Sequence, residues 1–215
     1  MNKLNKIRLP LDIMMTLVSI VLMGGNFLFP AEIVHEILGV GLFILWSVHI
    51  FLNRRWYGAI CKGKYNPCRI MQTVINCCIL ICTIFLMISG IILSNQLFTL
   101  LNIQSGLGFA RIAHLLASHW YYLFMSLHIG LHVGRLFQDI TTKIIPRIIL
   151  ALVCAYGIYA FIARGVWKYL ILRQQFFFFD LDRGYILFAI DYISIIILFA
   201  TLSHLLAKSL KKGKL

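Results

Sequence analysis

The chain has 215 residues, of which 61% are hydrophobic and 13% are charged, and its mean hydropathy is +0.90. This composition excludes a soluble globular domain of that size and indicates a protein of the lipid bilayer. A formal net charge of +13 would point to nucleic acid in a soluble protein, but here the cations gather between long apolar runs. Membrane topology accounts for such cations, so we expect no nucleic-acid partner.

Apolar stretches recur along the chain at lengths that approach or reach what a helix needs to cross a bilayer. The first begins with basic residues, as a signal peptide does, but no small-x-small cleavage site follows Asn26, so we expect a retained helix. Connections are short apart from residues 54–69, 94–109 and 164–184, which predicts one integral membrane domain over residues 1–215. The sequence therefore predicts an all-α, polytopic membrane protein with six transmembrane helices at about 11–29, 33–53, 70–94, 109–134, 146–163 and 185–207.

Lysine and arginine are unevenly distributed between the two sides of these predicted spans. With the N-terminus in the cytoplasm, fifteen of the 20 Lys and Arg residues fall on the cytoplasmic side. Cytoplasmic loops carry the excess of basic residues in membrane proteins, so this pattern predicts that both termini are cytoplasmic. The five cations on the outer side are Arg111, Arg164, Lys168, Arg173 and Arg183.

The second and fourth predicted spans each carry two histidines with the same spacing. His35 and His49 are fourteen residues apart, and so are His114 and His128. At about 100° and 1.5 Å per residue, both members of a pair share one helix face and lie roughly 21 Å apart along the axis. Two facing helices with such pairs are suited to two stacked haems, each with one axial imidazole from either helix.

The predicted topology decides how these histidines pair, because spans two and four run in the same direction. His35 and His114 therefore lie near the outer leaflet and are predicted to ligate the iron of an outer haem b. His49 and His128 lie near the cytoplasmic cations and are predicted to ligate the iron of an inner haem b. The predicted fold is a four-helix haem-binding bundle at about 11–138, followed by helices five and six. A lone intramembrane histidine commonly hydrogen-bonds a neighbouring helix, but two depth-matched pairs favour a functional site.

The other histidines are weaker candidates. His132 follows His128 by one turn on the same face and is a rival ligand for the inner iron; it would otherwise contact a propionate, a quinone or an interfacial group. His119 lies about 140° around the helix from His114, which argues against a shared role. His204 stands alone in the sixth span and is interpreted as structural. The six cysteines form no CxxCH motif, so covalent c-type haem is not supported.

Two further features leave alternatives open. Asp191 is a carboxylate well inside a span, so we expect it to be hydrogen-bonded, protonated or facing a polar cavity, with a proton or quinone role as one interpretation. The aromatic run Phe176–Phe179 fits an interfacial belt, or a loop that docks a partner or caps a haem.

Glycines within the spans would let a flat macrocycle approach the backbone or let helices pack closely. These glycines are Gly24, Gly25, Gly39, Gly41, Gly90, Gly130 and Gly134.

Three segments carry a family resemblance. The fourth span, RIAHLLASHWYYLFMSLHIGLHVGRL from Arg111 to Leu136, resembles the signature of small bacterial membrane proteins called flavinylation-associated cytochromes. HEILGVGLFILWSVHIFLNRRWY resembles that family's first histidine helix, and FFFFDLDRGYILFAIDY resembles its closing segment. Together these segments cover spans two to six. One departure is His119, where we expect a non-ligating aromatic residue.

The resemblance implies a b-type cytochrome of the bacterial cytoplasmic membrane that passes electrons toward extracytoplasmic proteins with covalent flavin. Carried onto this chain, it implies His35, His49, His114 and His128 as haem residues, with His132 beside them. We therefore expect an electron-transfer subunit in membrane lipid rather than a stand-alone enzyme. The alternatives are a quinone-reactive cytochrome b anchor of a dehydrogenase or reductase, and a haem-free metal or proton transporter lined by His and Asp191.

Overall fold

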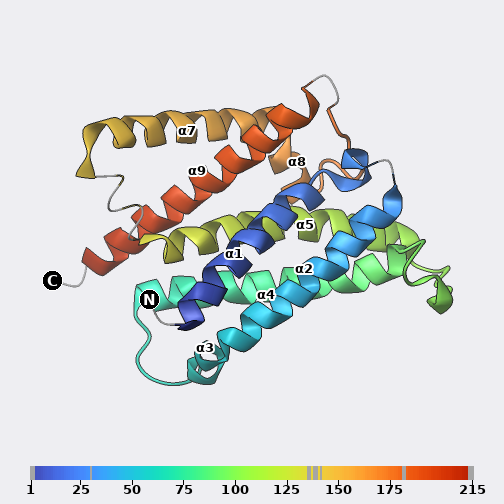
Figure 1. The fold of residues 1–215 in the computed structure, drawn as a ribbon, viewed down its shortest axis with the longest axis horizontal. Coiled ribbons are helices and arrows are strands. Elements are labelled where there is room, and N and C mark those ends of the chain that lie inside the picture. The colour runs from blue at the N-terminus through green and yellow to red at the C-terminus, as the bar shows by residue number, and fades with distance from the viewer. Residues whose placement is uncertain are drawn as a thin grey trace. The chain divides into compact units, whose positions relative to one another are not determined.

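The described residues fold into helices joined by short connections. The computed structural model describes residues 3–29, 31–134, 137, 140, 142–180 and 183–212, and these contain no strand. The expected all-α class is therefore confirmed (Figure 1). The main helices are α1 (Lys3–Leu22), α2 (Glu32–Leu52), α4 (Pro67–Leu93), α5 (Leu107–His132), α7 (Ile144–Ala163) and α9 (Gly184–Lys212). Shorter elements are η1 (Gly25–Leu28), α3 (Arg54–Ala59), η2 (Thr99–Leu101) and α8 (Val166–Leu170).

Four of the long helices have the length and composition of membrane spans. They are Ile33–Leu52 in α2, Pro67–Leu93 in α4, Ile144–Ala163 in α7 and Gly184–Lys211 in α9. Large apolar side chains project from them, with Ile44 and Leu152 more than half exposed. Exposed apolar side chains of this kind are unfavourable in water and favourable in contact with lipid chains. The chain therefore has the features of a multi-pass membrane protein.

The other two predicted spans are helical but less apolar. Helix α1 opens with three basic residues among its first six, and α5 carries four histidines and an arginine. These polar residues lower the hydropathy of both helices, and neither qualifies as a span on hydropathy and length alone. A count of six spans, and the location of the termini, remain predictions from the sequence.

Helix α1 ends earlier than the predicted first span of 11–29. The helix stops at Leu22, and a turn at Met23–Gly24 leads into η1. The reason lies in Gly25, whose φ of 59° is a left-handed conformation that breaks an α-helix and that glycine adopts without strain. The predicted continuous stretch is therefore wrong beyond Leu22.

Contacts divide the chain into two compact units that cut across α4 and α5. The first unit comprises Met1–Lys64 and Thr83–His114, and the second comprises Tyr65–Cys82 and Leu115–Leu215. In the first unit, α1 packs against α2 (Figure 1), and Arg8 Nη2 donates a hydrogen bond to the Leu52 carbonyl at 2.8 Å.

The first unit also fixes the loop after α4 through one carboxylate on α2. Glu36 accepts hydrogen bonds from the Ser94 hydroxyl at 2.6 Å and from the backbone N–H groups of Asn95 and Leu97, each at 2.9 Å. Hydrogen bonds to a charged acceptor are among the stronger ones. Glu36 therefore ties α2, one residue after His35, to the start of the connection that leads into α5.

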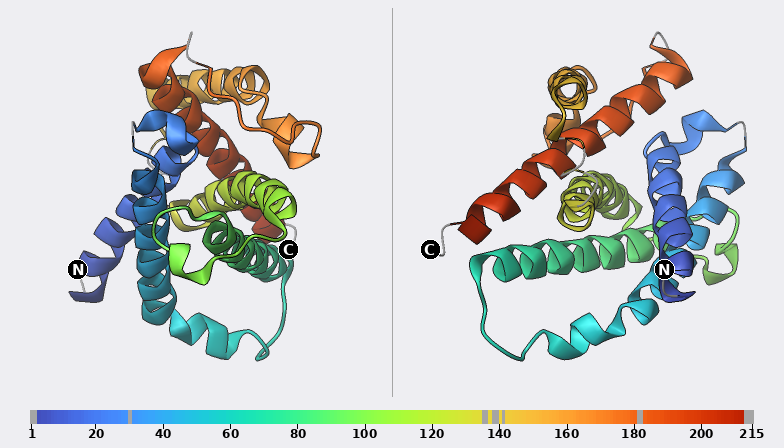
Figure 2. Two further views of the ribbon diagram at one scale, coloured as in Figure 1. Left: turned by 90° about the vertical axis from the view of Figure 1, so that its right-hand side faces the viewer. Right: turned by 60° about the vertical axis from the view of Figure 1, so that its left-hand side comes forward.

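In the second unit, small residues let helices approach α9 closely (Figure 2). A side chain at Gly157 on α7 would lie 2.6 Å from the Ser194 carbonyl oxygen of α9. A side chain at Gly130 on α5 would collide with the Ala200 carbonyl oxygen. Ser203 on α9 adds a hydrogen bond to the Leu127 carbonyl at 2.6 Å. Of the two interpretations open for Gly130, close helix packing is the one the structure supports.

Candidate functional site

The first unit brings His35 of α2 and His114 of α5 face to face. Their ring centroids are 6.3 Å apart, and the ring planes are inclined by 61°. Metal–nitrogen bonds to imidazole are about 2 Å long, so two imidazoles on opposite sides of one metal have ring centroids about 6 Å apart. The observed separation matches that spacing, and it also lies within the range of an ordinary edge-to-face contact between two rings.

Ser89 of α4 determines which nitrogen of His114 faces a ligand. The Ser89 hydroxyl donates its proton to the Phe85 carbonyl at 2.5 Å, so its oxygen is left to accept from Nδ1 of His114 at 3.0 Å. Nδ1 therefore carries the ring proton, and the lone pair is on Nε2. A metal-ligating histidine almost always donates its other ring N–H in this way, which orients the ring and raises its basicity.

The opposite ring has a backbone acceptor. His35 donates a hydrogen bond to the carbonyl of Gly25, the residue whose left-handed conformation ends the turn after α1. On the other side of the site, the backbone of Gly90 approaches His114, since a side chain there would lie 3.7 Å from the ring. A side chain at Gly39, one turn after His35 on α2, would meet no atom within 4 Å. Each ring is thus held by a hydrogen bond to a neighbouring segment. The surface of α2 at Gly39, one turn after His35, is not covered by other atoms.

His49 and His128 each have a similar acceptor. Asp12 Oδ1 of α1 lies 2.8 Å from Nδ1 of His49, within the first unit. Asn76 Oδ1 of α4 lies 2.8 Å from Nδ1 of His128, within the second unit. Both oxygens accept, so each imidazole carries its proton on Nδ1 and its lone pair on Nε2. The two histidines belong to different units, and their pairing remains a prediction from the sequence.

His132 differs from His128 in its surroundings. It is the last residue of α5 and is exposed, and its ring centroid lies 4.5 Å from that of His128. Only one of two rings so close on the same helix can take the axial position of one haem. The contact with Asn76 favours His128 as the ligand of the two.

The donor set fits haem better than a metal ion held by side chains alone. Among the described residues, no group of three or more His, Cys, Asp and Glu side chains could hold a metal ion. Structural and catalytic zinc sites need three or four protein ligands, whereas a haem iron with two axial histidines needs only two imidazoles. The His35–His114 pair meets that lower requirement.

We compared the chain with models of known families, curated proteins and solved structures. None matches. The resemblance to flavinylation-associated cytochromes therefore rests on the sequence segments alone.

His119 is placed as a packed core residue in the second unit. Its side chain is buried, its Nδ1 donates to the Leu115 carbonyl at 2.8 Å, and its ring stacks on Tyr169 of α8 with centroids 4.2 Å apart. The neighbouring Trp120 donates to the Leu170 carbonyl at 3.1 Å. These contacts anchor α8 on α5 and satisfy Nδ1, whereas the buried Nε2 of His119 has no hydrogen-bond partner among the described residues.

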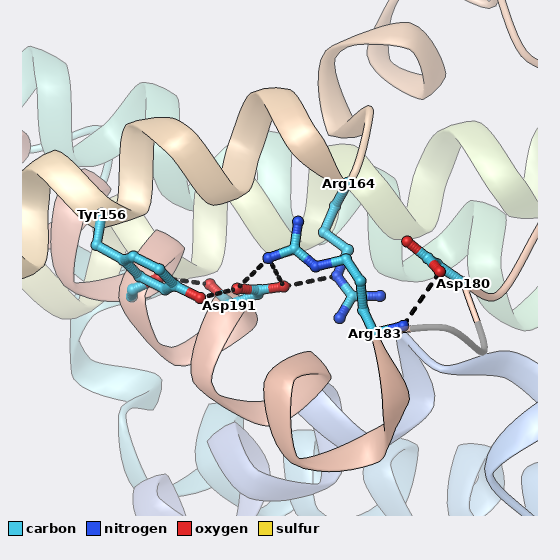
Figure 3. Close-up of polar contacts among 6 residues, drawn as sticks. Tyr156, Arg164, Asp180, Arg183 and Asp191 are labelled. Carbon is cyan, nitrogen blue, oxygen red and sulfur yellow. Dashed lines mark hydrogen bonds and ion pairs between the residues drawn. The ribbon is translucent and has the colours of Figure 1, made fainter.

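Asp191 lies at the centre of a buried ionic cluster (Figure 3). Its carboxylate is fully buried, with Arg164 Nε at 2.7 Å and Arg183 Nη2 at 3.2 Å. The Tyr156 hydroxyl donates to the same carboxylate at 2.6 Å. Burial alone would lower the pKa of Arg183, but the Asp191 carboxylate raises it above its ordinary value. Of the interpretations open for Asp191, the hydrogen-bonded, ion-paired one is observed, and the cluster joins the end of α7 to α9.

Sequence reasoning missed the side chains that orient the histidines. Ser89, Asn76 and Asp12 lie on different helices from the rings they contact. A polar residue at membrane depth is an available signal, and it would have marked Asn76 and Asp12 for attention. A serine in a span gives no such signal, because Ser commonly bonds to its own helix backbone.

Proposed function

We propose that this protein is a b-type cytochrome that moves electrons across a membrane through two haems with paired histidine ligands. The observation that carries the proposal is the His35–His114 pair, with 6.3 Å between ring centroids and a hydrogen-bond acceptor behind each ring. Six-coordinate iron with two axial imidazoles is suited to electron transfer rather than to oxygen chemistry.

In this function the chain holds, orients and insulates its cofactors. His35 and His114 ligate the outer haem, and His49 with His128 ligate the inner haem that the sequence spacing predicts. Ser89 keeps His114 in the tautomer that presents Nε2, and the Gly25 carbonyl holds the ring of His35. The apolar helices restrict water, which tunes the potential of each centre. When bound, haem supplies one-electron redox chemistry.

The proposed setting follows from the predicted topology and the family resemblance. The protein lies in the bacterial cytoplasmic membrane with six spans and both termini inside. Electrons leave toward an extracytoplasmic flavoprotein or another redox partner, and a quinone is a candidate donor. The protein is a subunit for electron transfer, without a bond-making reaction of its own.

The transporter alternative gains no support from Asp191. A proton or metal carrier needs a carboxylate that can exchange its ligand, whereas Asp191 is fully buried and contacts two guanidinium groups. Both carboxylate oxygens are therefore already engaged by structural partners. We therefore retain the cytochrome as the proposed function.

Haem content and spectrum test the proposal. The full chain, purified in detergent, should contain about two non-covalent haems and give a reduced-minus-oxidised spectrum of b type. His35→Ala and His114→Ala should each lose the same single haem, while His204→Ala, a change at another intramembrane histidine, should keep both. A folded, colourless wild-type protein would falsify the proposal.

A further inference from the structure

A carboxylate contacts one predicted haem ligand through the packing of α1 on α2. Asp12 Oδ1 lies 2.8 Å from His49 Nδ1. One turn earlier on α1, Arg8 bonds to the Leu52 carbonyl, three residues farther along α2. The two contacts share one antiparallel register, so Asp12 faces His49 because of helix packing and not through a loop.

Charge distinguishes this contact from the other ring contacts described above. The acceptors for His35, His114 and His128 are a backbone carbonyl, a hydroxyl and an amide oxygen. All three acceptors are neutral, although the Glu36 carboxylate acts on His35 through space, whereas a carboxylate contacts His49 directly. Among these four contacts, the one to His49 is therefore the strongest in electrostatic terms.

A negative charge behind an axial imidazole disfavours reduction of the iron it ligates. Reduction adds one electron and removes one positive charge from the centre, so the carboxylate stabilises the oxidised form more than the reduced form. Ligand hydrogen bonding is among the means by which a protein sets haem potential. The His49 and Asp12 side chains are 25% and 50% exposed, so solvent screens part of this effect.

We infer that Asp12 is a positioning residue that lowers the reduction potential of the haem held by His49 below that of the haem held by His35 and His114. The inference rests on the proposed function and adds a direction to it. One electron leaves the haem of His49, which is oxidised, and enters the haem of His35 and His114, which is reduced. With the predicted topology, this order favours transfer from the cytoplasmic side to the outer side.

A potentiometric titration of the full-length, haem-loaded protein tests this order. Asp12→Asn keeps an acceptor oxygen near His49 but removes its charge. We expect it to raise one of the two midpoint potentials by about 59 mV. This shift corresponds to a change of about tenfold in the equilibrium constant for one-electron reduction. The other midpoint should stay in place. The shifted midpoint must be the lower one, and it must be the one that His49→Ala removes.

Two control variants separate charge from structure. Asp12→Glu keeps the negative charge and should leave both midpoints near their wild-type values. Asp180→Asn removes an equal charge from an exposed side chain that bonds the Arg183 backbone, and it should also leave both in place.

Several outcomes overturn the inference while the cytochrome proposal stands. These are unchanged midpoints in Asp12→Asn, equal shifts in Asp12→Glu and Asp12→Asn, and loss of the haem from Asp12→Asn with the haem retained in wild type. Absence of haem from the wild-type protein would instead remove the proposed function, and this inference with it.

Discussion

The hydroxyl of Ser89 lies 3.0 Å from Nδ1 of His114, while its own proton is committed to the Phe85 carbonyl one turn earlier on α4. The ring must therefore be the donor, and its orientation is set by a neighbouring helix rather than by its own rotamer alone. This contact can be removed by a small substitution on α4 that leaves His114 itself unchanged.

Ser89→Ala should weaken haem binding at the outer site without unfolding the protein. Loss of a hydrogen bond to a metal-ligating histidine typically costs about 10- to 100-fold in affinity. The measurement is the rate of haem transfer from purified protein to an excess of apomyoglobin, followed by absorbance. Ser47→Ala is the matched control, because Ser47 bonds to the Phe43 carbonyl of its own helix. Equal transfer rates for the two variants would contradict the orienting role of Ser89.

His128→Ala should remove the inner haem, whereas His132→Ala should retain it. The structural reason is Asn76, whose Oδ1 accepts from His128 at 2.8 Å and fixes its tautomer. Haem per chain, measured as the pyridine haemochrome, should fall by half in the first variant only. Asn76→Leu should loosen the same haem as His128→Ala. The reverse pattern, with haem lost from His132→Ala alone, would assign the inner ligand to His132.

Asp191→Asn should destabilise the fold by on the order of 3 kcal/mol, because it leaves the buried guanidinium of Arg164 and the partly exposed one of Arg183 without their anion. Arg164 has little room to compensate, since its side chain is 5% exposed and its Nη2 has no hydrogen-bond partner among the described residues. Thermal unfolding in detergent, followed by circular dichroism, measures the change. Asp180→Asn should have little effect, as Asp180 is exposed. Identical melting curves for the two variants would show that the cluster does not stabilise the fold.

Hydropathy was sufficient to predict the helices but not their contacts. Apolar runs of spanning length predicted helices that the structure has at α2, α4, α7 and α9. The prediction works because a helix that crosses a bilayer must be apolar along its own length, so the signal lies within one segment. The left-handed φ of Gly25 shows the limit of this reasoning, since one residue within an apolar run ended a predicted span early.

The candidate site depended on information that no single segment carries. The fourteen-residue spacing and the predicted topology paired His35 with His114, and the structure places their ring centroids 6.3 Å apart, while their role as haem ligands stays a prediction. The identity of the acceptor behind each ring depends on how separate helices pack, so Ser89 and Asp12 could not be paired with their histidines from spacing. Asp191 illustrates the same limit, because its arginine partners lie 27 and 8 residues away along the chain.

Gly130→Ala should destabilise the protein through overpacking rather than through any effect on a cofactor. The added methyl group would collide with the Ala200 carbonyl oxygen and approach Ser203 Oγ, so α5 and α9 must separate. Overpacking of this kind costs about 1–3 kcal/mol, which exceeds the gain of about 1 kcal/mol from replacing a helical glycine with alanine. Gly108→Ala is a matched control on the same helix, because a side chain there meets no atom within 4 Å. Unfolding midpoints in detergent should fall for Gly130→Ala and hold or rise for Gly108→Ala. A Gly130→Ala protein with wild-type stability would mean that α5 and α9 do not approach as closely as the Gly130–Ala200 contact requires.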